Sequence, residues 1–298
     1  MTSHAHCGAI SELLLSSEIP WLRIVQGSPP DSPASLRDPE WEPHLDHGGR
    51  VCAYTREIDG RGWLYLPGLA WYRFPAGGGS IEAMPARNAP TDTITEAYYR
   101  IALPMALQAA GYEVLHASAV SDGRGVHVFC GASRSGKSTI AYALGRRGFE
   151  IWADDAVAFR IDGGGITAVP LPFALRLRGE VADFFGVPTS PGWKGDGKTE
   201  TLRHQASSPR EIVSVSLLER SRNAAIDRLS ARESLPGVLY HSFYFSLEDS
   251  SVLQRMGTQF LELIGGVPLF RVSLRPGLAG MAEVLDDLER QVLAPAAA

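Results

Sequence analysis

A glycine-rich segment, GASRSGKST, satisfies the G-x-x-x-x-G-K-[ST] pattern of a P-loop. Its residues are Gly131, Ala132, Ser133, Arg134, Ser135, Gly136, Lys137, Ser138 and Thr139. Glycines let backbone amides curl around phosphates, and the amino end of a following helix adds the positive end of its dipole. In such a loop the lysine bridges β- and γ-phosphate oxygens, and the Ser138 hydroxyl binds Mg²⁺. The pattern therefore predicts a site for ATP and Mg²⁺.

The local context favours a functional loop over a glycine-rich turn that binds nothing. The motif follows an apolar run at 126–130, which is typical of a strand. It precedes a helical segment at 138–147. Strand, loop and helix in that order are what phosphate binding through backbone amides requires.

Two adjacent carboxylates, Asp154 and Asp155, follow a predicted strand at 149–153. We expect this strand to lie next to the P-loop strand. Open α/β sheets bind ligands at the carboxyl ends of their strands, which would bring the two carboxylates to the phosphates. One carboxylate would then hold Mg²⁺, directly or through water, while the other accepts the proton of an attacking hydroxyl. Taken alone, the pair would as readily form a solvated turn or a helix cap. Its position after the P-loop favours catalysis.

Other polar groups give weaker signals. His116 ends an apolar run before the P-loop, where a structural histidine is at least as common as one that transfers protons. The segment 193–203 carries basic residues among glycines, and closing over phosphates and lying as a solvated loop are equally open. The aromatic run that starts at His241 is more typical of a core. We expect no metal site at His4, His6 and Cys7 or at His44 and His47.

The elements that position these residues start after Pro90. Residues 93–111 have helical periodicity, with Thr93 and Glu96 in capping-box order and Pro104 expected to kink the helix. Further on, strands alternate with helices, which is typical of an α/β domain. The strands are expected at 126–130, 149–153, 174–177, 212–218 and 269–274, and a closing helix at 281–292.

The segment before Pro90 is rich in proline, glycine and tryptophan, and it predicts a small β-rich region. Strand-like runs lie at 51–54, 62–66 and 71–74, and the glycines at 77–79 suggest a hairpin turn. The sequence thus predicts two domains: 1–92, small and β-rich, and 93–298, an α/β P-loop domain.

Composition excludes several classes of protein. With 298 residues and 45% hydrophobic residues the chain can form a real core. A net charge of -5 at pH 7 disfavours nucleic acid and anionic membrane surfaces as partners. No run approaches the roughly 18 apolar residues that span a bilayer. The three cysteines lack CxxC spacing, so we expect a cytoplasmic protein without disulfides or structural zinc.

The order LHASAV, GASRSGKST, a helix ending in RRG and ADDAV resembles the catalytic domain of HPr kinase/phosphorylase. In overall layout it is most similar to the HPr-kinase-related kinases that modify ribosomally made peptides such as lasso precursors. The matching core covers 111–160, with a weaker echo to about 186. The resemblance implies an HPr-kinase-like catalytic domain that phosphorylates a serine hydroxyl of a peptide or small protein. By position, Asp154 resembles the acid/base residue, Asp155 its acidic neighbour near the metal, and His116 the histidine that supports the aspartate.

Two departures from the family are informative. Thr139 follows Ser138 where family P-loops often have glutamate, as in more distant relatives. The family segment LEIRG reads LRLRG here, so Arg176 replaces a glutamate associated with the metal site. Either Glu180 compensates or the second-metal arrangement differs, and this leaves a reverse phosphorylase reaction open. HPr itself is not expected to be the substrate.

The sequence therefore predicts an ATP-dependent serine kinase that acts on a peptide or small protein without a covalent enzyme intermediate. Asp154, His116 and Lys137 are the expected catalytic residues, and Ser138 and Asp155 the expected metal ligands. Two alternatives stay open: a small-molecule alcohol kinase of the same fold and a nucleotide-gated regulatory P-loop module. The number of copies that assemble is also open, a homo-oligomer included.

Overall fold

The computed structural model describes residues 21–31, 40–45, 50–74, 80–163, 165–187, 198–204, 206–243 and 250–293. Contacts between Cα atoms divide the chain into two compact units, Met1–Gly111 and Tyr112–Ala298. The helical segment after Pro90 therefore packs with the first unit, whereas the sequence interpretation grouped it with the P-loop domain that begins at 93. Within the described residues, no helix combines the length and apolarity needed to cross a bilayer.

The first unit contains a six-stranded sheet in the order β1-β6-β5-β4-β3-β2. Neighbouring strands are antiparallel except β1 and β6, which are parallel. The expected runs at 51–54, 62–66 and 71–74 lie within β3, β4 and β5, and β5 pairs antiparallel with β6, as in a hairpin. The glycines at 77–79 lie outside the described residues. The strands are β1 (Trp21–Ile24), β2 (Glu42–Leu45), β3 (Val51–Ile58), β4 (Arg61–Leu66), β5 (Ala70–Phe74) and β6 (Ser80–Pro85).

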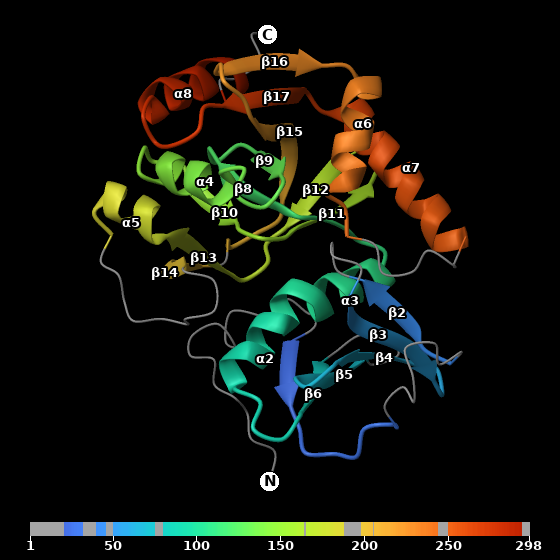
Figure 1. The fold of residues 1–298 in the computed structure, drawn as a ribbon. Coiled ribbons are helices and arrows are strands. Elements are labelled where there is room, and N and C mark those ends of the chain that lie inside the picture. The colour runs from blue at the N-terminus through green and yellow to red at the C-terminus, as the bar shows by residue number, and fades with distance from the viewer. Residues whose placement is uncertain are drawn as a thin grey trace. The chain divides into compact units, whose positions relative to one another are not determined.

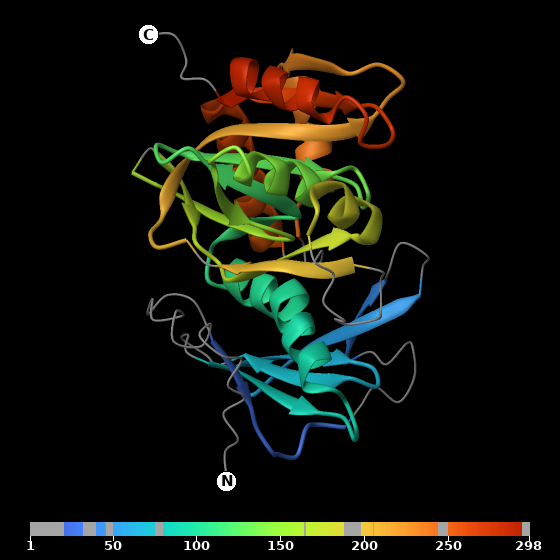
Figure 2. The ribbon, with the colours of Figure 1, turned by 90° about the vertical axis from the view of Figure 1, so that its left-hand side faces the viewer.

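Aromatic side chains form much of the core of this unit. Tyr65 stacks on Trp71 with ring centroids 4.1 Å apart, and Trp41 meets the same indole edge-on at 5.4 Å. The buried Tyr72 hydroxyl donates a hydrogen bond to the Ile94 carbonyl at 2.7 Å. This bond ties the helical segment to the sheet, across which it lies in Figure 2.

That helical segment differs from its prediction at both the start and the middle. It consists of α2 (Thr91–Ala97), the π-helical turn η1 (Tyr98–Ala102) and α3 (Leu103–Ala109). The capping box was wrong: Thr93 lies inside α2, whose N-cap residue, Pro90, makes no side-chain cap bond. The Leu103 amide donates to Tyr98, five residues back, just before Pro104. Because proline lacks an amide and crowds the preceding turn, the widened turn accommodates it.

The second unit is built on a nine-stranded mixed sheet, with main order β10-β8-β9-β15-β12-β11-β7. Strand β17 pairs parallel with β15 and antiparallel with β16. All five expected strands are present, one of them as β13 (Phe173–Arg178), which pairs with β14 (Lys198–His204) in a separate two-stranded sheet. Strands β10 to β13 follow one another without a helix, so alternation is only partial. The strands are β7 (Glu113–Leu115), β8 (Ala117–Ser121), β9 (Val126–Gly131), β10 (Glu150–Ala153), β11 (Val157–Asp162), β12 (Gly165–Val169), β15 (Arg210–Arg220), β16 (Ala225–Leu229) and β17 (Leu269–Leu274).

Helices cover both faces of this sheet (Figure 1). One face packs against α4 (Lys137–Gly145), α5 (Gly179–Phe185) and α8 (Met281–Leu288), with the turn η2 (Glu289–Leu293) after it. The other packs against α6 (Ala231–Tyr240) and α7 (Ser250–Gly266). Residues of β9 alternate between these two cores: Val128 and Cys130 join the second and Phe129 the first. A strand buried on both faces explains why the run before the P-loop is apolar apart from the buried His127.

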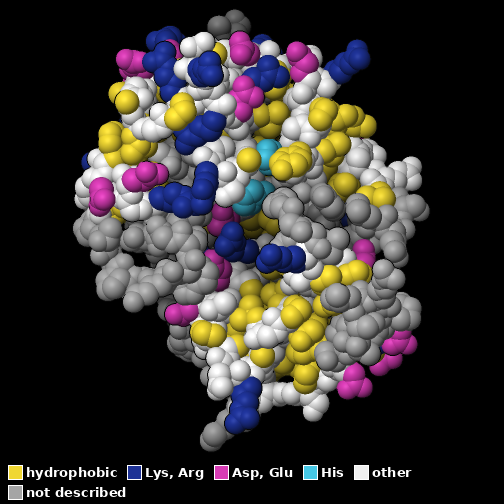
Figure 3. All heavy atoms as spheres, in the orientation of Figure 1, with side chains coloured by type: hydrophobic (Ala, Val, Ile, Leu, Met, Phe, Trp, Pro, Cys, Tyr) yellow, Lys and Arg dark blue, Asp and Glu magenta, His cyan; other side chains and the backbone are white. Residues whose placement is uncertain are grey.

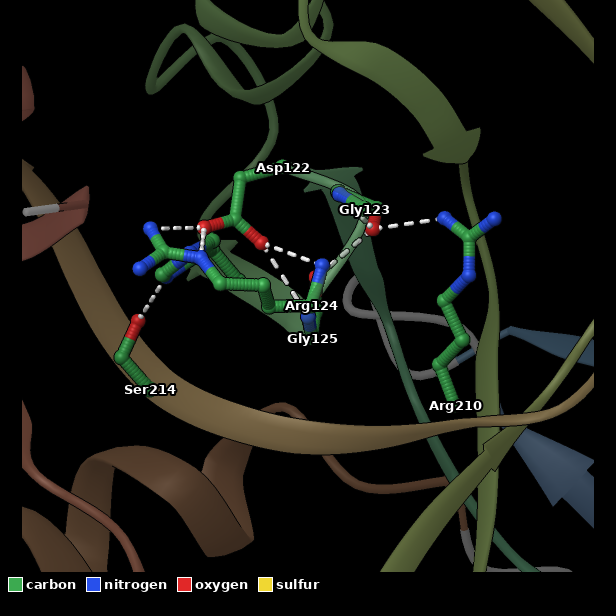
Figure 4. Close-up of polar contacts among 8 residues, drawn as sticks. Asp122, Gly123, Arg124, Gly125, Arg210 and Ser214 are labelled. Atoms are coloured by element: carbon green, nitrogen blue, oxygen red, sulfur yellow. Dashed lines mark hydrogen bonds and ion pairs between the residues drawn. The ribbon is translucent and has the colours of Figure 1, made fainter. Parts of the chain in front are cut away.

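A polar network closes the turn between β8 and β9 (Figure 4). The Asp122 carboxylate accepts hydrogen bonds from the backbone amides of Arg124 at 2.9 Å and Gly125 at 3.1 Å. Arg210 of β15 donates to the Ser121 hydroxyl at 2.7 Å and pairs with Glu150 of β10 at 2.5 Å. These bonds fix the register of the hairpin, and therefore which residues meet at its far end.

Candidate active site

The two carboxylates and the P-loop meet at one edge of the sheet, although their strands are not neighbours. The expected pairing of the strand before Asp154 with the P-loop strand is wrong, because β8 lies between β10 and β9. Strand β8 is antiparallel to both, so β10 and β9 point the same way. Their carboxyl ends, and the start of β8, therefore share an edge.

The P-loop backbone requires glycine at both glycine positions of its motif. A Cβ on Gly131 would lie 2.4 Å from the Ser135 hydroxyl and 2.9 Å from the Leu218 carbonyl oxygen. Gly136 has φ 113 and Arg134 has φ 68, so the loop reverses twice through left-handed conformations before α4 begins. The predicted order of strand, loop and helix is thus present, with α4 starting at Lys137.

Lys137 folds back over the loop. Its Nζ atom donates to the Gly131 carbonyl at 2.7 Å and lies 3.4 Å from the Ala132 carbonyl, and the residue is 7% exposed. The buried Ser135 hydroxyl has no hydrogen-bond partner among the described residues. An ammonium group and an orphaned hydroxyl in one glycine-dependent cradle fit an oxyanion such as a phosphate.

Asp154 connects the P-loop to the end of β10. Its Oδ1 atom accepts hydrogen bonds from Ser138 at 2.8 Å and from Ser118 at 2.5 Å, and the residue is 6% exposed. Ser138 and the carboxylate are oxygen donors of the kind that Mg²⁺ prefers. The predicted base and the predicted metal ligand are therefore in contact. Ser118 was missed, because a serine in a buried strand carries no sequence signal of its own.

Asp155 and His116 meet through the backbone. Asp155 has φ 66, and its carbonyl oxygen lies 3.1 Å from Nδ1 of His116. A carbonyl only accepts, so Nδ1 of His116 donates in this contact. The resemblance implied that His116 supports the aspartate; here it holds the strained turn that carries Asp154.

A second histidine stands at the site. The His116 amide donates to the His241 carbonyl at 2.7 Å. Burial, together with the charges of Lys137 and His116, lowers the pKa of His241 to about 4, so its ring is neutral at pH 7. The aromatic run that starts at His241 was expected to belong to the core. The two histidines are brought together by the pairing of Leu115 with Ser242, which no local pattern reveals.

Arg220 is a further residue at the site that no sequence motif indicates. It ends β15, which runs parallel to β9. Its guanidinium donates to the Arg275 carbonyl at 2.9 Å and the Arg134 carbonyl at 3.3 Å, so it lies against the P-loop. Figure 3 shows Lys and Arg side chains, in dark blue, spread over this face of the second unit, with histidine in cyan reaching the surface.

The remaining predicted residues lie elsewhere or outside the described part of the chain. Arg176 lies in β13 (Phe173–Arg178), opposite Glu200 of β14 (Lys198–His204), and Glu180 lies in the first turn of α5. The expected basic loop at 193–203 is in part a strand, because Lys198 onward belongs to β14, while 193–197 are not described. His44 lies in β2 with Nε2 2.7 Å from the Thr55 hydroxyl. Residues 4, 6, 7 and 47 are not described.

Comparisons with known proteins found a distant likeness among solved structures. No family model matches the sequence, and no curated protein matches it. Among solved structures, the Hpr(Ser) kinase/phosphatase from Coxiella burnetii is similar over 60% of this chain and 97% of that chain. The sequence identity is 13% and the TM-score is 0.30. A likeness this distant assigns no function, so the case rests on the residues of the chain itself.

Proposed function

We propose that this protein is an ATP-dependent kinase that transfers the γ-phosphoryl group to a serine hydroxyl of a peptide or small protein. The observation that carries the proposal is the 2.8 Å hydrogen bond between Asp154, buried at the end of β10, and Ser138 of the P-loop. It puts a candidate base beside a candidate phosphate cradle. A kinase needs both within reach of one phosphoryl group.

The residues of the chain divide the work of an in-line transfer. When bound, Mg²⁺ neutralises charge on the phosphates, with Ser138 and Asp155 as its protein ligands. Lys137 and the amides of 132–137 stabilise the negative charge on the migrating group. Asp154 accepts the proton of the serine hydroxyl while the serine oxygen bonds to the γ-phosphorus. At the same time the bond between the γ-phosphorus and the bridging β-phosphate oxygen breaks. No enzyme group becomes phosphorylated.

Ser118 and His116 act as positioning residues in this scheme. Ser118 is fully buried and bonds the same carboxylate oxygen as Ser138, so it fixes the rotamer of Asp154. The His116 ring contacts the Asp155 carbonyl and steadies the turn after β10. A base held in this way meets its acceptor in a productive geometry without reorganising.

The acceptor class rests on the order of motifs along the chain. LHASAV, the P-loop and ADDAV occur as in kinases that modify serine in small proteins and ribosomal peptides. A precursor of a lasso or other ribosomal peptide is therefore the proposed acceptor.

A direct test incubates the full chain with Mg²⁺, γ-labelled ATP and a library of serine-containing peptides. Products are identified by mass spectrometry. We expect phosphoserine with the wild type, loss of it with Asp154→Asn, and retention with Asp227→Asn, a matched exchange at an exposed position on β16.

Three outcomes would count against the proposal. Phosphorylation of small alcohols but of no peptide would identify a small-molecule kinase. Phosphate release without any phosphorylated acceptor would identify a nucleotide-gated regulatory module. Full peptide phosphorylation by Asp154→Asn would remove the assigned base.

A further inference from the structure

A cavity of about 230 Å³ adjoins the P-loop within the second unit. Gly136 and Thr139 line it, whereas Ser138 and Asp154 do not. Successive side chains of a helix point about 100° apart, so the cavity and the Asp154 contact lie on different sides of the first turn of α4. Residues of α4, α5 and α8 line it, and Figure 1 shows α4 and α8 side by side.

The position of the γ-phosphate determines which way a bound nucleotide runs along the P-loop. Its γ-phosphate belongs where Lys137 and Asp154 are, because transfer occurs there. The α-phosphate and the nucleoside must then lie away from Asp154. Thr139, the residue after the Ser138 hydroxyl, opens into the cavity on that side.

The walls of the cavity suit a purine nucleoside. The ends of two parallel strands contribute to it: Arg220 ends β15, Ala224 lies after β15, and Arg275 follows β17. Carboxylates at its edge can accept hydrogen bonds from ribose hydroxyls and ring amino groups, and an apolar lining can pack on a planar base. The apolar residues are Ile140, Leu274, Leu278, Met281 and Val284, and the carboxylates are Glu180, Glu283 and Asp287.

The size of the cavity matches part of a ligand. Sites for whole drug-sized molecules run from about 300 to 1,000 Å³, so this space holds a nucleoside but not its phosphates as well. The phosphates have their own place on the P-loop. Arg220 lies between the two, because it lines the cavity and bonds the Arg134 carbonyl of the loop.

We infer that this cavity is the nucleoside subsite of the kinase and that it provides the affinity for ATP beyond that of a bare triphosphate. The inference rests on the proposed function, since it takes the P-loop as the phosphate site. It assigns nucleotide preference to α8 and the turn before it, a part of the chain that carries no recognised motif.

The test compares two ligands by titration calorimetry with Mg²⁺: ATP and inorganic tripolyphosphate. Ala279→Trp and Ala224→Trp fill the cavity from separate loops, and both alanines are exposed, so folding should tolerate them. Ala282→Trp, exposed on α8 outside the cavity, is the matched control. Circular dichroism checks that each variant is folded.

We expect each cavity variant to weaken ATP binding about tenfold or more while tripolyphosphate affinity stays within about twofold. Ala282→Trp should change neither affinity. If both cavity variants bind ATP as the wild type does, or lose both ligands equally, the nucleoside subsite is wrong while the phosphate cradle stands. If the wild type binds neither ligand, the proposed function itself fails, and this inference with it.

Discussion

Strand β9 has a polar cluster at each end, and the two clusters use similar residues differently. At the amino end, Asp122 accepts from Arg124 and Gly125, and Arg210 joins Ser121 to Glu150 (Figure 4). These groups form hydrogen bonds with one another. At the carboxyl end, Lys137 rests on backbone carbonyls, the Ser135 hydroxyl has no partner among the described residues, and a cavity opens alongside.

The backbone conformations at the two ends of β9 also differ. The turn at the amino end places a glycine, Gly123, at positive φ, where it costs little. At the carboxyl end Arg134 and Asp155 adopt positive φ without being glycine, which costs about 1 kcal/mol or more each. One end of the strand serves stability, and the other keeps strained non-glycine residues where a ligand would bind. Variants at the two ends should therefore separate activity from stability.

The largest expected effect is that of Asp154→Asn on transfer. Loss of a general base lowers kcat by about 10²- to 10⁴-fold, while ATP affinity stays near that of the wild type. Asp122→Asn makes the same exchange at the other end and should leave kcat within about twofold. Steady-state kinetics on the phosphorylated peptide measure both. Equal losses in the two variants would erase the distinction between the ends.

Next in size is the loss of stability in Gly125→Ala. Its Cβ would lie 2.3 Å from Cγ1 of Val213 and 3.1 Å from the Glu211 carbonyl oxygen, so strand β15 must move. We expect the free energy of unfolding to fall by about 1–3 kcal/mol, as measured by urea denaturation. The folded fraction should bind ATP normally. Gly123→Ala is the control for positive φ alone, since nothing lies near its Cβ position.

The amino end should also contribute a pH dependence of stability through His127. Burial lowers the pKa of His127 to about 4, the nearby Arg124 lowers it and Asp122 opposes the shift, and Nδ1 lies 2.8 Å from the Ser214 hydroxyl. The unfolded chain takes up the proton first as pH falls below 6.5. Stability is therefore complete above that pH and lost on acidification toward 4, by on the order of 1–3 kcal/mol.

His127→Gln isolates this effect. His241 also has a lowered pKa and adds to the loss with the same sign, so the comparison is between variant and wild type. Urea denaturation at pH 7.5 and 5 should show a smaller loss in the variant. An identical loss would mean that the ring of His127 is protonated without penalty.

The smallest expected effect is that of Ser118→Ala at the carboxyl end. Its hydroxyl orients Asp154 but touches no reacting atom in the proposed scheme, so kcat should fall only about three- to tenfold. KM for ATP should stay constant, and Ser118→Thr should restore part of the rate. Ser121→Ala, on the same strand at the amino end, should lower thermal stability and leave kcat unchanged.

Local patterns predicted the strand, loop and helix of the P-loop because each depends on neighbours in sequence. The five expected strands of the second unit were found for the same reason: each is a local, mostly apolar run. Pairing was not local. The position of β8 between β9 and β10 depends on a hairpin that folds back, so the expected strand adjacency was wrong even though Asp154 reached the expected edge.

Residues that join the site through long-range pairing could not be found from spacing. These residues come from different strands and turns. Ser118 bonds Asp154, Arg220 bonds the Arg134 carbonyl, and the charge of Lys137 acts on His241. The capping box at Thr93 failed because α2 begins at Thr91, with Pro90 as its N-cap residue. In each case tertiary packing decided between options that the local sequence left open.

The most direct test of the central claim is calorimetric titration of ATP at millimolar Mg²⁺ into the wild type, Lys137→Ala and Arg124→Ala. If backbone amides and Lys137 hold a triphosphate, the wild type binds one ATP per chain, Lys137→Ala weakens binding about tenfold or more, and Arg124→Ala binds as the wild type does. Absence of binding by any purine triphosphate, or equal affinity in Lys137→Ala, would contradict the account.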